Sequence, residues 1–183
     1  AQKIMRKSEE IVELSEKVRQ IEVLNRQEST HKEVIDIVEI VEQTVADLEQ
    51  TYPSAESTVT SGQADAYTIG LISASINNVI ENAVEHNDRS TPEIEVSVTE
   101  ATDEAKHIAI AVSDNGPGLP DREREVIEAG TESPLNHSNG LGLWITSWIV
   151  TRSGGTITFS ENSPRGSTIT IRLPSVASKT DLS

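Results

Sequence analysis

The sequence predicts an α/β protein: a two-layer sandwich, in which a mixed sheet carries helices on one face, preceded by a long N-terminal helix. Three observations indicate this class. Segments 94–98 and 108–112 are short and apolar or alternating, as central strands are. Segment 68–85 repeats its apolar residues at helical spacing. Segments 156–160 and 167–173 flank a turn-rich stretch, as the arms of a hairpin do.

The first predicted element is a helix over residues 1–28, which contain no Gly or Pro. Ile4, Ile11 and Val18 lie seven residues apart, and a second apolar series follows three residues later. Such a stripe is typical of a coiled coil. The helix either packs on its own domain or forms the seam of a dimer or bundle, and the narrow stripe favours the seam.

The domain that follows is expected to span residues 31–176, with a disordered tail at 177–183. Its predicted elements are a strand at 33–38, a helix to Gln50 that Pro53 ends, an edge strand at 56–60, a helix at 68–85, strands at 94–98 and 108–112, an irregular segment at 120–139, a helix at 141–151, and the hairpin 156–160 and 167–173 with its turn at 162–166. An irregular segment as long as 120–139 is usually functional or mobile.

The chain is strongly acidic, with 30 acidic and 15 basic residues and a formal net charge of −15. This balance disfavours nucleic-acid binding, which requires a basic surface. The acids are spread over every predicted element instead of forming a tail. Dispersed charge of one sign destabilises a fold unless salt screens it, so we expect a salt-rich cytoplasm, as in a haloarchaeon. The alternative is an acidic domain of an ordinary mesophile.

Cysteines and long apolar segments are both missing from the sequence. Without cysteine there are no disulfides or thiolate metal sites, which is compatible with a cytoplasmic location. No apolar run approaches the roughly 20 residues that a bilayer span needs, and no signal peptide opens the chain. Since the chain begins at Ala1 without a Met, we expect it to be part of a longer protein.

The first chemical motif is a pair of asparagines on one predicted helix. Asn78 and Asn82 are four residues apart, so their side chains share a face. An amide oxygen is a hard, neutral ligand that suits Mg²⁺. The alternative for two helical asparagines is local capping.

The second motif, Asp114-Asn115-Gly116-Pro117-Gly118, follows a predicted central strand. Gly116 and Gly118 let the backbone turn sharply and approach a ligand without a Cβ in the way. A plain turn between two elements is the alternative.

The third motif, Asn139-Gly140-Leu141-Gly142-Leu143, leads into a predicted helix. Gly140 and Gly142 leave backbone amides free at the helix N-terminus, where the dipole favours anions such as phosphate.

In this order, the three motifs resemble the N, G1 and G2 boxes of sensor histidine kinase catalytic domains. These domains share the GHKL nucleotide-binding fold with type II topoisomerases, MutL and Hsp90. The resemblance covers nearly the whole chain and is most specific from Asn78 to Leu143. It implies that the chain binds ATP with Mg²⁺.

The resemblance also implies residue roles. Asn82 ligates the Mg²⁺ that bridges the phosphates, and Asp114 accepts a hydrogen bond from the adenine amino group. Asn78 is the catalytic candidate, which would polarise or position the acceptor imidazole. Hydrolytic relatives carry there a Glu that activates water, and an amide cannot accept that proton, so Asn78 favours transfer to another acceptor over hydrolysis. The expected ATP-binding residues are Asn82, Glu85, His86, Asp114, Gly116, Gly118, Leu119, His137, Ser138, Asn139, Gly140, Leu141, Gly142, Leu143 and Ser167.

Several positions depart from the family pattern. Glu85 stands where members often have Lys or Arg, and Ser138 where they often have Gly. The segment 120–139 corresponds to the family's lid, and Val126-Ile127-Glu128 replaces its usual Phe pair. Ser167 matches a hydroxyl position near adenine, although a plain strand serine fits equally well.

The four histidines bear on phosphoacceptor function. None of them, at positions 31, 86, 107 and 137, has the context of an acceptor, whereas His86 and His137 are candidates for the pocket. His107 is expected to be an exposed hairpin residue. Residues 1–30 resemble the second helix of the family's dimerization hairpin, so we expect the acceptor helix before Ala1.

The sequence therefore predicts the ATP-binding catalytic region of a sensor histidine kinase. Its parent would transfer the γ-phosphoryl to an upstream His and then to a response-regulator receiver domain. It would dimerise through the N-terminal helix in the cytoplasm, without nucleic acid and without spanning a membrane in this region. The rival hypotheses are a non-catalytic ATP-binding switch and a hydrolytic ATPase of the same fold.

Overall fold

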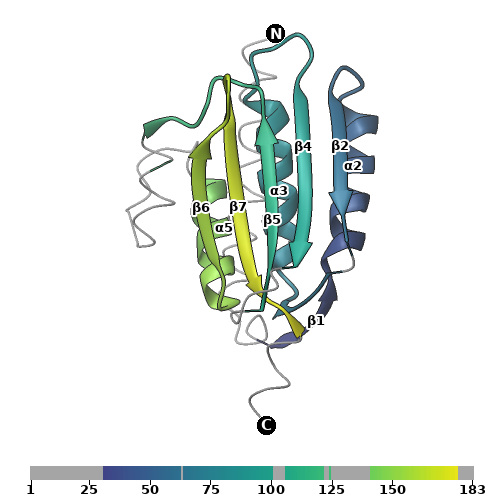
Figure 1. Ribbon diagram of the computed structural model, residues 1–183, viewed down its shortest axis with the longest axis vertical. Helices are drawn as coiled ribbons and strands as arrows, with labels where there is room; N and C mark the ends of the chain where they lie inside the picture. Colours follow the sequence, from purple (N-terminus) through teal and green to yellow (C-terminus); the bar gives the residue numbers. More distant parts are fainter. Residues whose placement is uncertain (1–30, 63, 101–105, 122–123, 125–140, 177–183) are drawn as a thin grey trace, which may run out of the picture.

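The computed structural model describes residues 31–62, 64–100, 106–121, 124 and 141–176 (Figure 1). The predicted N-terminal helix, the tail at 177–183 and most of segment 120–139 lie outside these residues. The elements in chain order are β1 (Lys32–Asp36), α2 (Ile37–Thr51), β2 (Glu56–Ser61), β3 (Asp65–Ile69), α3 (Ile72–Glu85), β4 (Glu93–Glu100), β5 (His107–Asp114), α5 (Leu141–Arg152), β6 (Thr156–Glu161) and β7 (Ser167–Pro174).

The main sheet has five strands in the order β2-β4-β5-β7-β6. The β2–β4 pair is parallel and the other pairs are antiparallel, so the sheet is mixed. Helices α2, α3 and α5 lie together behind this sheet in Figure 1, which makes the two layers. The predicted α/β sandwich with helices on one face is therefore confirmed.

Alternation along the strands explains why one sheet face is buried. In β4, Ile94, Val96 and Val98 are buried, whereas Glu93 and Glu95 at the alternate positions are exposed. Successive strand residues point to opposite faces, so this period places the three apolar side chains against the helices. The same face of β5 and β7 completes the apolar layer.

Helix α3 occupies the centre of the helical layer. Its residues Ile72, Ile76, Val79 and Ile80 are at most 1% exposed and recur at steps of three and four. Burying each such side chain contributes about 1.5–3 kcal/mol, so this stripe fixes α3 on the sheet. Because the chemical motifs begin on this helix, the core also positions the site.

The predicted start of the central helix is wrong. Thr68 and Ile69 belong to β3, a strand that the sequence analysis missed and that pairs antiparallel with β1. Ile69 is buried, and a single buried apolar residue fits either period, so its pattern misled the prediction. The pairing with β1 decides between them, and α3 begins at Ile72.

The predicted strand at 33–38 is too long at its C-terminal end. Asp36 is the N-cap of α2, and its Oδ1 accepts a hydrogen bond from the Glu39 amide at 3.0 Å. This bond satisfies a free amide of the first turn, so Ile37 and Val38 join the helix. The predicted edge strand, central strands, last helix and closing hairpin are confirmed.

Membrane-spanning helices are not found in the part of the chain that the structure describes.

Candidate functional site

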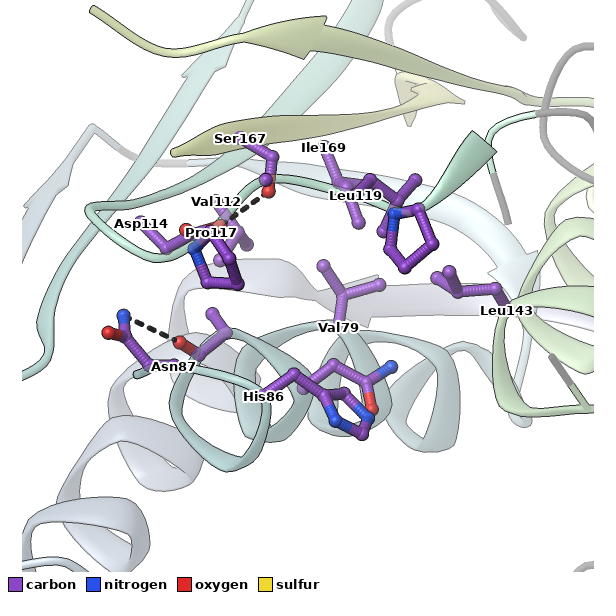
Figure 2. A pocket seen from close by; sticks show the side chains of 14 residues that line it. Val79, His86, Asn87, Val112, Asp114, Pro117, Leu119, Leu143, Ser167 and Ile169 are labelled. Atoms are coloured by element: carbon purple, nitrogen blue, oxygen red, sulfur yellow. Dashed lines mark hydrogen bonds between the residues drawn. The ribbon is translucent and has the colours of Figure 1, made fainter. Parts of the chain in front are cut away.

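A cavity of about 270 Å³ opens between α3, the start of α5 and the ends of β5 and β7. Figure 2 shows α3 side chains facing those of the sheet and the loop after β5 across this space. The lining residues are Val79, Asn82, Ala83, His86, Asn87, Val112, Asp114, Pro117, Gly118, Leu119, Pro120, Leu143, Ser167 and Ile169. The lining is mostly apolar with a few convergent polar groups, which is typical of a small-molecule site.

The carboxylate of Asp114 is held by two donors. Its Oδ1 accepts from the Gly116 amide at 2.7 Å, and its Oδ2 accepts from Ser167 Oγ at 2.6 Å. Ser167 is 5% exposed, so its hydroxyl is fixed within the wall of the cavity. Each carboxylate oxygen can accept more than one hydrogen bond, so Asp114 keeps capacity for a donor on a ligand.

The turn between β6 and β7 holds the backbone of Asp114. Asn162 Nδ2 donates to the Asp114 carbonyl at 2.9 Å. Gly166 has φ +117°, and a Cβ built there would lie 1.9 Å from the same carbonyl oxygen. Only glycine combines that conformation with so close an approach, so this turn sets the position of Asp114 and Ser167 together.

The end of α3 is tied to the turn after β5 by two asparagines. Asn87 Nδ2 donates to Asn115 Oδ1 at 3.0 Å and to the Ala83 carbonyl at 3.3 Å. The amide of Glu93 also donates to Asn115 Oδ1, at 3.1 Å. His86 is exposed at the C-cap of α3 and borders the same cavity.

An ion pair lies beside this end of the site. Arg165 donates to both carboxylate oxygens of Asp88, at 2.8 and 2.6 Å. This hydrogen-bonded pairing lowers the pKa of Asp88 and raises the pKa of Arg165. The pair joins the β6–β7 turn to the loop after α3.

The opposite end of the cavity is bounded by Asn82 and Leu143. Asn78, one turn before Asn82, does not line the cavity. Its Nδ2 donates to Thr146 Oγ1 on α5 at 3.1 Å. Gly142 packs directly against the Asn78 carboxamide.

Glu85 also lies outside the cavity lining. Its Oε1 accepts from the Tyr52 hydroxyl at 2.9 Å, which directs the carboxylate toward α2. Burial raises the pKa of Tyr52 to about 12, and the Glu85 hydrogen bond and charge and the charge of Glu81 add to this effect.

The structure brings seven of the fifteen predicted ATP-binding residues together around one cavity. Those that line it are Asn82, His86, Asp114, Gly118, Leu119, Leu143 and Ser167. Gly116 contributes its amide to Asp114, and Gly142 begins α5 beside Asn78. His137, Ser138, Asn139 and Gly140 lie outside the described residues, and of Leu141 only the backbone is described.

Sequence reasoning missed several lining residues. Asn87 directly follows His86, and its position after the N motif could have signalled it. Ile169 lies two residues after Ser167 on the same strand, so the strand period places both on one face. Thr146 and Asn162, which hold site residues without lining the cavity, had no local signal, because their partners lie 68 and 48 residues away in the chain.

Metal-ligand clusters of three or more His, Cys, Asp or Glu side chains do not occur among the described residues. Asn82 is one lining side chain whose amide oxygen could hold a cation together with ligand and water oxygens. That ligand set suits Mg²⁺, which keeps several waters and binds phosphate.

The segment after the cavity is described only at its start. The Arg124 guanidinium lies 4.6 Å from the centroid of the Phe159 ring, and its Nη2 is 3.3 Å from Glu161 Oε1. These contacts tie the chain after Pro120 to β6.

Comparison with known protein families gives a match to the histidine kinase-, DNA gyrase B-, and HSP90-like ATPase family over residues 71–177. Sensor histidine kinase DpiB of Escherichia coli is 32% identical over 106 residues, which are 56% of this chain and 19% of DpiB. Sporulation kinase B of Bacillus subtilis is 27% identical over 154 residues, which are 81% of this chain and 35% of that kinase. The chain thus spans about a fifth to a third of these relatives.

Solved structures of similar fold include two histidine kinases. A mycobacterial sensor histidine kinase, MprB, superposes with a TM-score of 0.65 at 25% identity, covering 79% of this chain and 97% of that one. Acinetobacter baumannii histidine kinase AdeS superposes with a TM-score of 0.70 at 20% identity, covering 94% of this chain and 82% of that one.

Proposed function

This chain belongs to the histidine kinase-, DNA gyrase B-, and HSP90-like ATPase family, and we propose that it is the ATP-binding catalytic region of a sensor histidine kinase. The single observation that carries ATP as the ligand is the carboxylate of Asp114, held at the cavity wall by Ser167 and Gly116. A fixed carboxylate accepts from the adenine amino group and rejects guanine, which presents a carbonyl at that position.

The remaining cavity suits the rest of the nucleotide. Apolar side chains, among them Val79, Val112 and Ile169, offer surfaces for the base. Asn82 lies at the end near the start of α5, where backbone amides and the helix dipole favour phosphate. Mg²⁺ bound there by Asn82 and the phosphates would neutralise charge on the transferring phosphoryl group.

Asn78 supports transfer over hydrolysis. Its carboxamide cannot take a proton from water, and its Nδ2 is already engaged with Thr146. Catalysis by this chain would then consist of positioning ATP for attack by a histidine on another segment. Two other functions remain alternatives: hydrolysis of ATP, and nucleotide-dependent switching without catalysis, which Glu85 and the divergent lid sequence favour.

The biological setting follows from the same proposal. The partner would be the receiver domain of a response regulator, and the parent protein would dimerise through the segment 1–30 in the cytoplasm. The net charge of −15 supports adaptation to concentrated salt, as in haloarchaea.

The test is incubation with γ-labelled ATP and Mg²⁺ in molar KCl, with and without a separately produced helix that carries an acceptor His followed by an acid. We expect label on the added helix and none on the chain alone. Label on the chain alone would contradict the assignment of His31, His86, His107 and His137 as non-acceptors. Rapid release of phosphate without labelled protein would establish the hydrolytic alternative.

ATP binding without transfer or hydrolysis would favour the non-catalytic switch.

Asn82→Ala is the matched variant for the transfer assay, because it removes the proposed metal ligand and leaves Asp114 intact. We expect it to abolish transfer.

A further inference from the structure

A hydrogen bond joins the two helices at the end of the cavity that is bounded by Asn82 and Leu143. Asn78 Nδ2 on α3 donates to Thr146 Oγ1 on α5 at 3.1 Å. Thr146 is fully buried, with 0% exposure, and a buried hydroxyl is costly to leave without a partner. The contact therefore fixes how the two helices face each other.

Gly142 brings the first turn of α5 against the same side chain. A Cβ built on Gly142 would lie 2.5 Å from Asn78 Oδ1, 3.0 Å from Nδ2 and 3.1 Å from Cγ. The carboxamide of Asn78 thus fills the space over Gly142 and also reaches Thr146 one turn further along α5. Two points on one helix are held by one side chain, which limits both sliding and rotation of α5.

The residues on either side of this contact belong to the cavity. Asn82 lies one turn after Asn78 on α3, and Leu143 directly follows Gly142 on α5, and both line the cavity. A shift of α5 relative to α3 would therefore change the distance between the Asn82 amide and the start of α5.

We propose that Thr146 is a positioning residue: through its bond to Asn78, it sets the start of α5 relative to Asn82 and so aligns the phosphate end of the nucleotide site. The position of α5 depends on this hydrogen bond whether or not ATP is the ligand. Its effect on phosphate rests on the proposed function, in which ATP occupies this cavity.

Tryptophan fluorescence reports on the environment of α5. Its two tryptophans, Trp144 and Trp148, are both on this helix and lie two residues before and after Thr146. Trp148 also stacks with Arg152, whose guanidinium is 4.7 Å from the ring centroid. All tryptophan fluorescence of the chain therefore comes from α5, with or without a nucleotide.

The test compares Thr146→Val, which keeps the shape and removes the hydroxyl, with Thr146→Ser, which keeps the hydroxyl. Thr151→Val is the matched control: it removes a hydroxyl from the same helix whose bond, to the Ser147 carbonyl at 2.8 Å, stays within α5. Calorimetry measures the affinity for Mg-ATP and for adenosine, and acrylamide quenching measures access to the tryptophans.

Thr146→Val should weaken Mg-ATP binding about three- to tenfold, the range that one hydrogen bond provides. The affinity for adenosine should change less than twofold, because adenosine lacks the phosphates that bind near the start of α5. Quenching of the tryptophans should increase. Thr146→Ser should restore both properties, and Thr151→Val should resemble the unsubstituted chain.

A double-mutant cycle distinguishes loss of the Asn78–Thr146 hydrogen bond from a general loss of stability. Asn78→Ala should increase acrylamide quenching of the tryptophans as Thr146→Val does. Quenching in the double variant should be no greater than in either single variant. If Thr146→Val does not fold, Thr146→Ala takes its place in the cycle. Additive effects on quenching would overturn the proposal.

The outcomes distinguish this inference from the proposed function. If the unsubstituted chain binds no ATP, the proposed function fails, and the quenching cycle still decides whether Thr146 places α5. Suppose that the unsubstituted chain binds ATP, but that Thr146→Val lowers the affinities for adenosine and Mg-ATP equally, or lowers neither. The positioning role is then overturned while the proposed function stands.

Discussion

At the scale of single residues, the carboxylate of Asp114 dominates the site because it is both fixed and negatively charged. Ser167 and Gly116 hold its two oxygens, so a ligand donor meets an acceptor that is already oriented. Hydrogen bonds to charged groups contribute roughly 1.5–3 kcal/mol, about twice as much as neutral ones. The proposed adenine contact should therefore depend on the charge and not only on the shape of this side chain.

Asp114→Asn should weaken ATP binding by about ten- to a hundredfold, because the amide preserves the shape and removes the charge. Calorimetry in molar KCl measures the loss. Asp47→Asn, on the exposed face of α2, is the control for removing one acid from this chain and should leave the affinity unchanged. Equal affinities for Asp114→Asn and the unsubstituted chain would refute the adenine assignment.

Tyr52 provides a second residue-scale prediction, because its pKa is raised to about 12 from the ordinary 10.0. Burial is the largest cause and the Glu85 hydrogen bond the next, so the protonated hydroxyl in this environment stabilises the fold below pH 10. That stability is lost as pH rises through the folded value, so the sensitive window is about pH 10–12. Glu85→Gln should lower the Tyr52 pKa part of the way to 10.0, since it removes the charge of Glu85 while burial, the largest cause, remains.

Ultraviolet titration of tyrosinate measures this shift. The chain has two tyrosines, and the difference from Tyr52→Phe isolates the signal of Tyr52. An unchanged pKa in Glu85→Gln would show that Glu85 does not hold this hydroxyl.

Where chemistry and spacing were both local, the sequence predicted residues that the structure places at or beside the cavity. Asn82, Asp114 and the glycines of the second motif belong to short segments whose residue types already indicate a ligand. The direction of a side chain was not predictable in the same way. Glu85 lies near His86 in the chain, yet its bond to Tyr52 on another element takes it out of the cavity.

At the scale of elements, the strands with clear alternation and the helix α5 were predicted, whereas the short strand β3 was missed and was assigned to the helix that follows it. Strands β4 and β5 carry enough alternation to be recognised, because each is eight residues long. Strand β3 has five residues, and its identity depends on pairing with β1, which lies far away in the chain. No period in the segment 65–69 could have supplied that information.

The β6–β7 turn is the element on which the site geometry most depends, and Gly166 is its critical residue. Gly166→Ala should destabilise the fold by about 1–3 kcal/mol, because alanine is strained at φ +117° and its Cβ would collide with the Asp114 carbonyl. Thermal or urea unfolding measures the change.

Gly62→Ala is the matched control, since a Cβ there meets nothing within 4 Å. The free energy of unfolding of this control should stay within about 0.5 kcal/mol of the unsubstituted chain. Equal stability of the two alanine variants would show that the turn does not need glycine at 166.

At the scale of the whole molecule, the acidic surface surrounds a core that is made mainly of Ile, Leu and Val. Ion pairs such as Arg124 with Glu161 and Arg165 with Asp88 neutralise some of these charges, but 15 basic residues can neutralise at most half of the 30 acids. The excess negative charge therefore repels itself across the surface. Such repulsion decreases when salt shortens the screening length from about 10 Å at 0.1 M to about 3 Å at 1 M.

The melting temperature should consequently rise as KCl increases from dilute to molar concentration, and scanning calorimetry across that series measures it. A variant with Glu42→Lys and Glu95→Lys, both exposed positions outside the cavity, carries less excess charge and should need less KCl to reach the same stability. Its lower dependence on salt would identify repulsion as the cause, because a general effect of KCl on apolar burial would act on both chains alike. A melting temperature that stays flat or falls with KCl would refute adaptation to salt and leave an acidic domain of an ordinary mesophile.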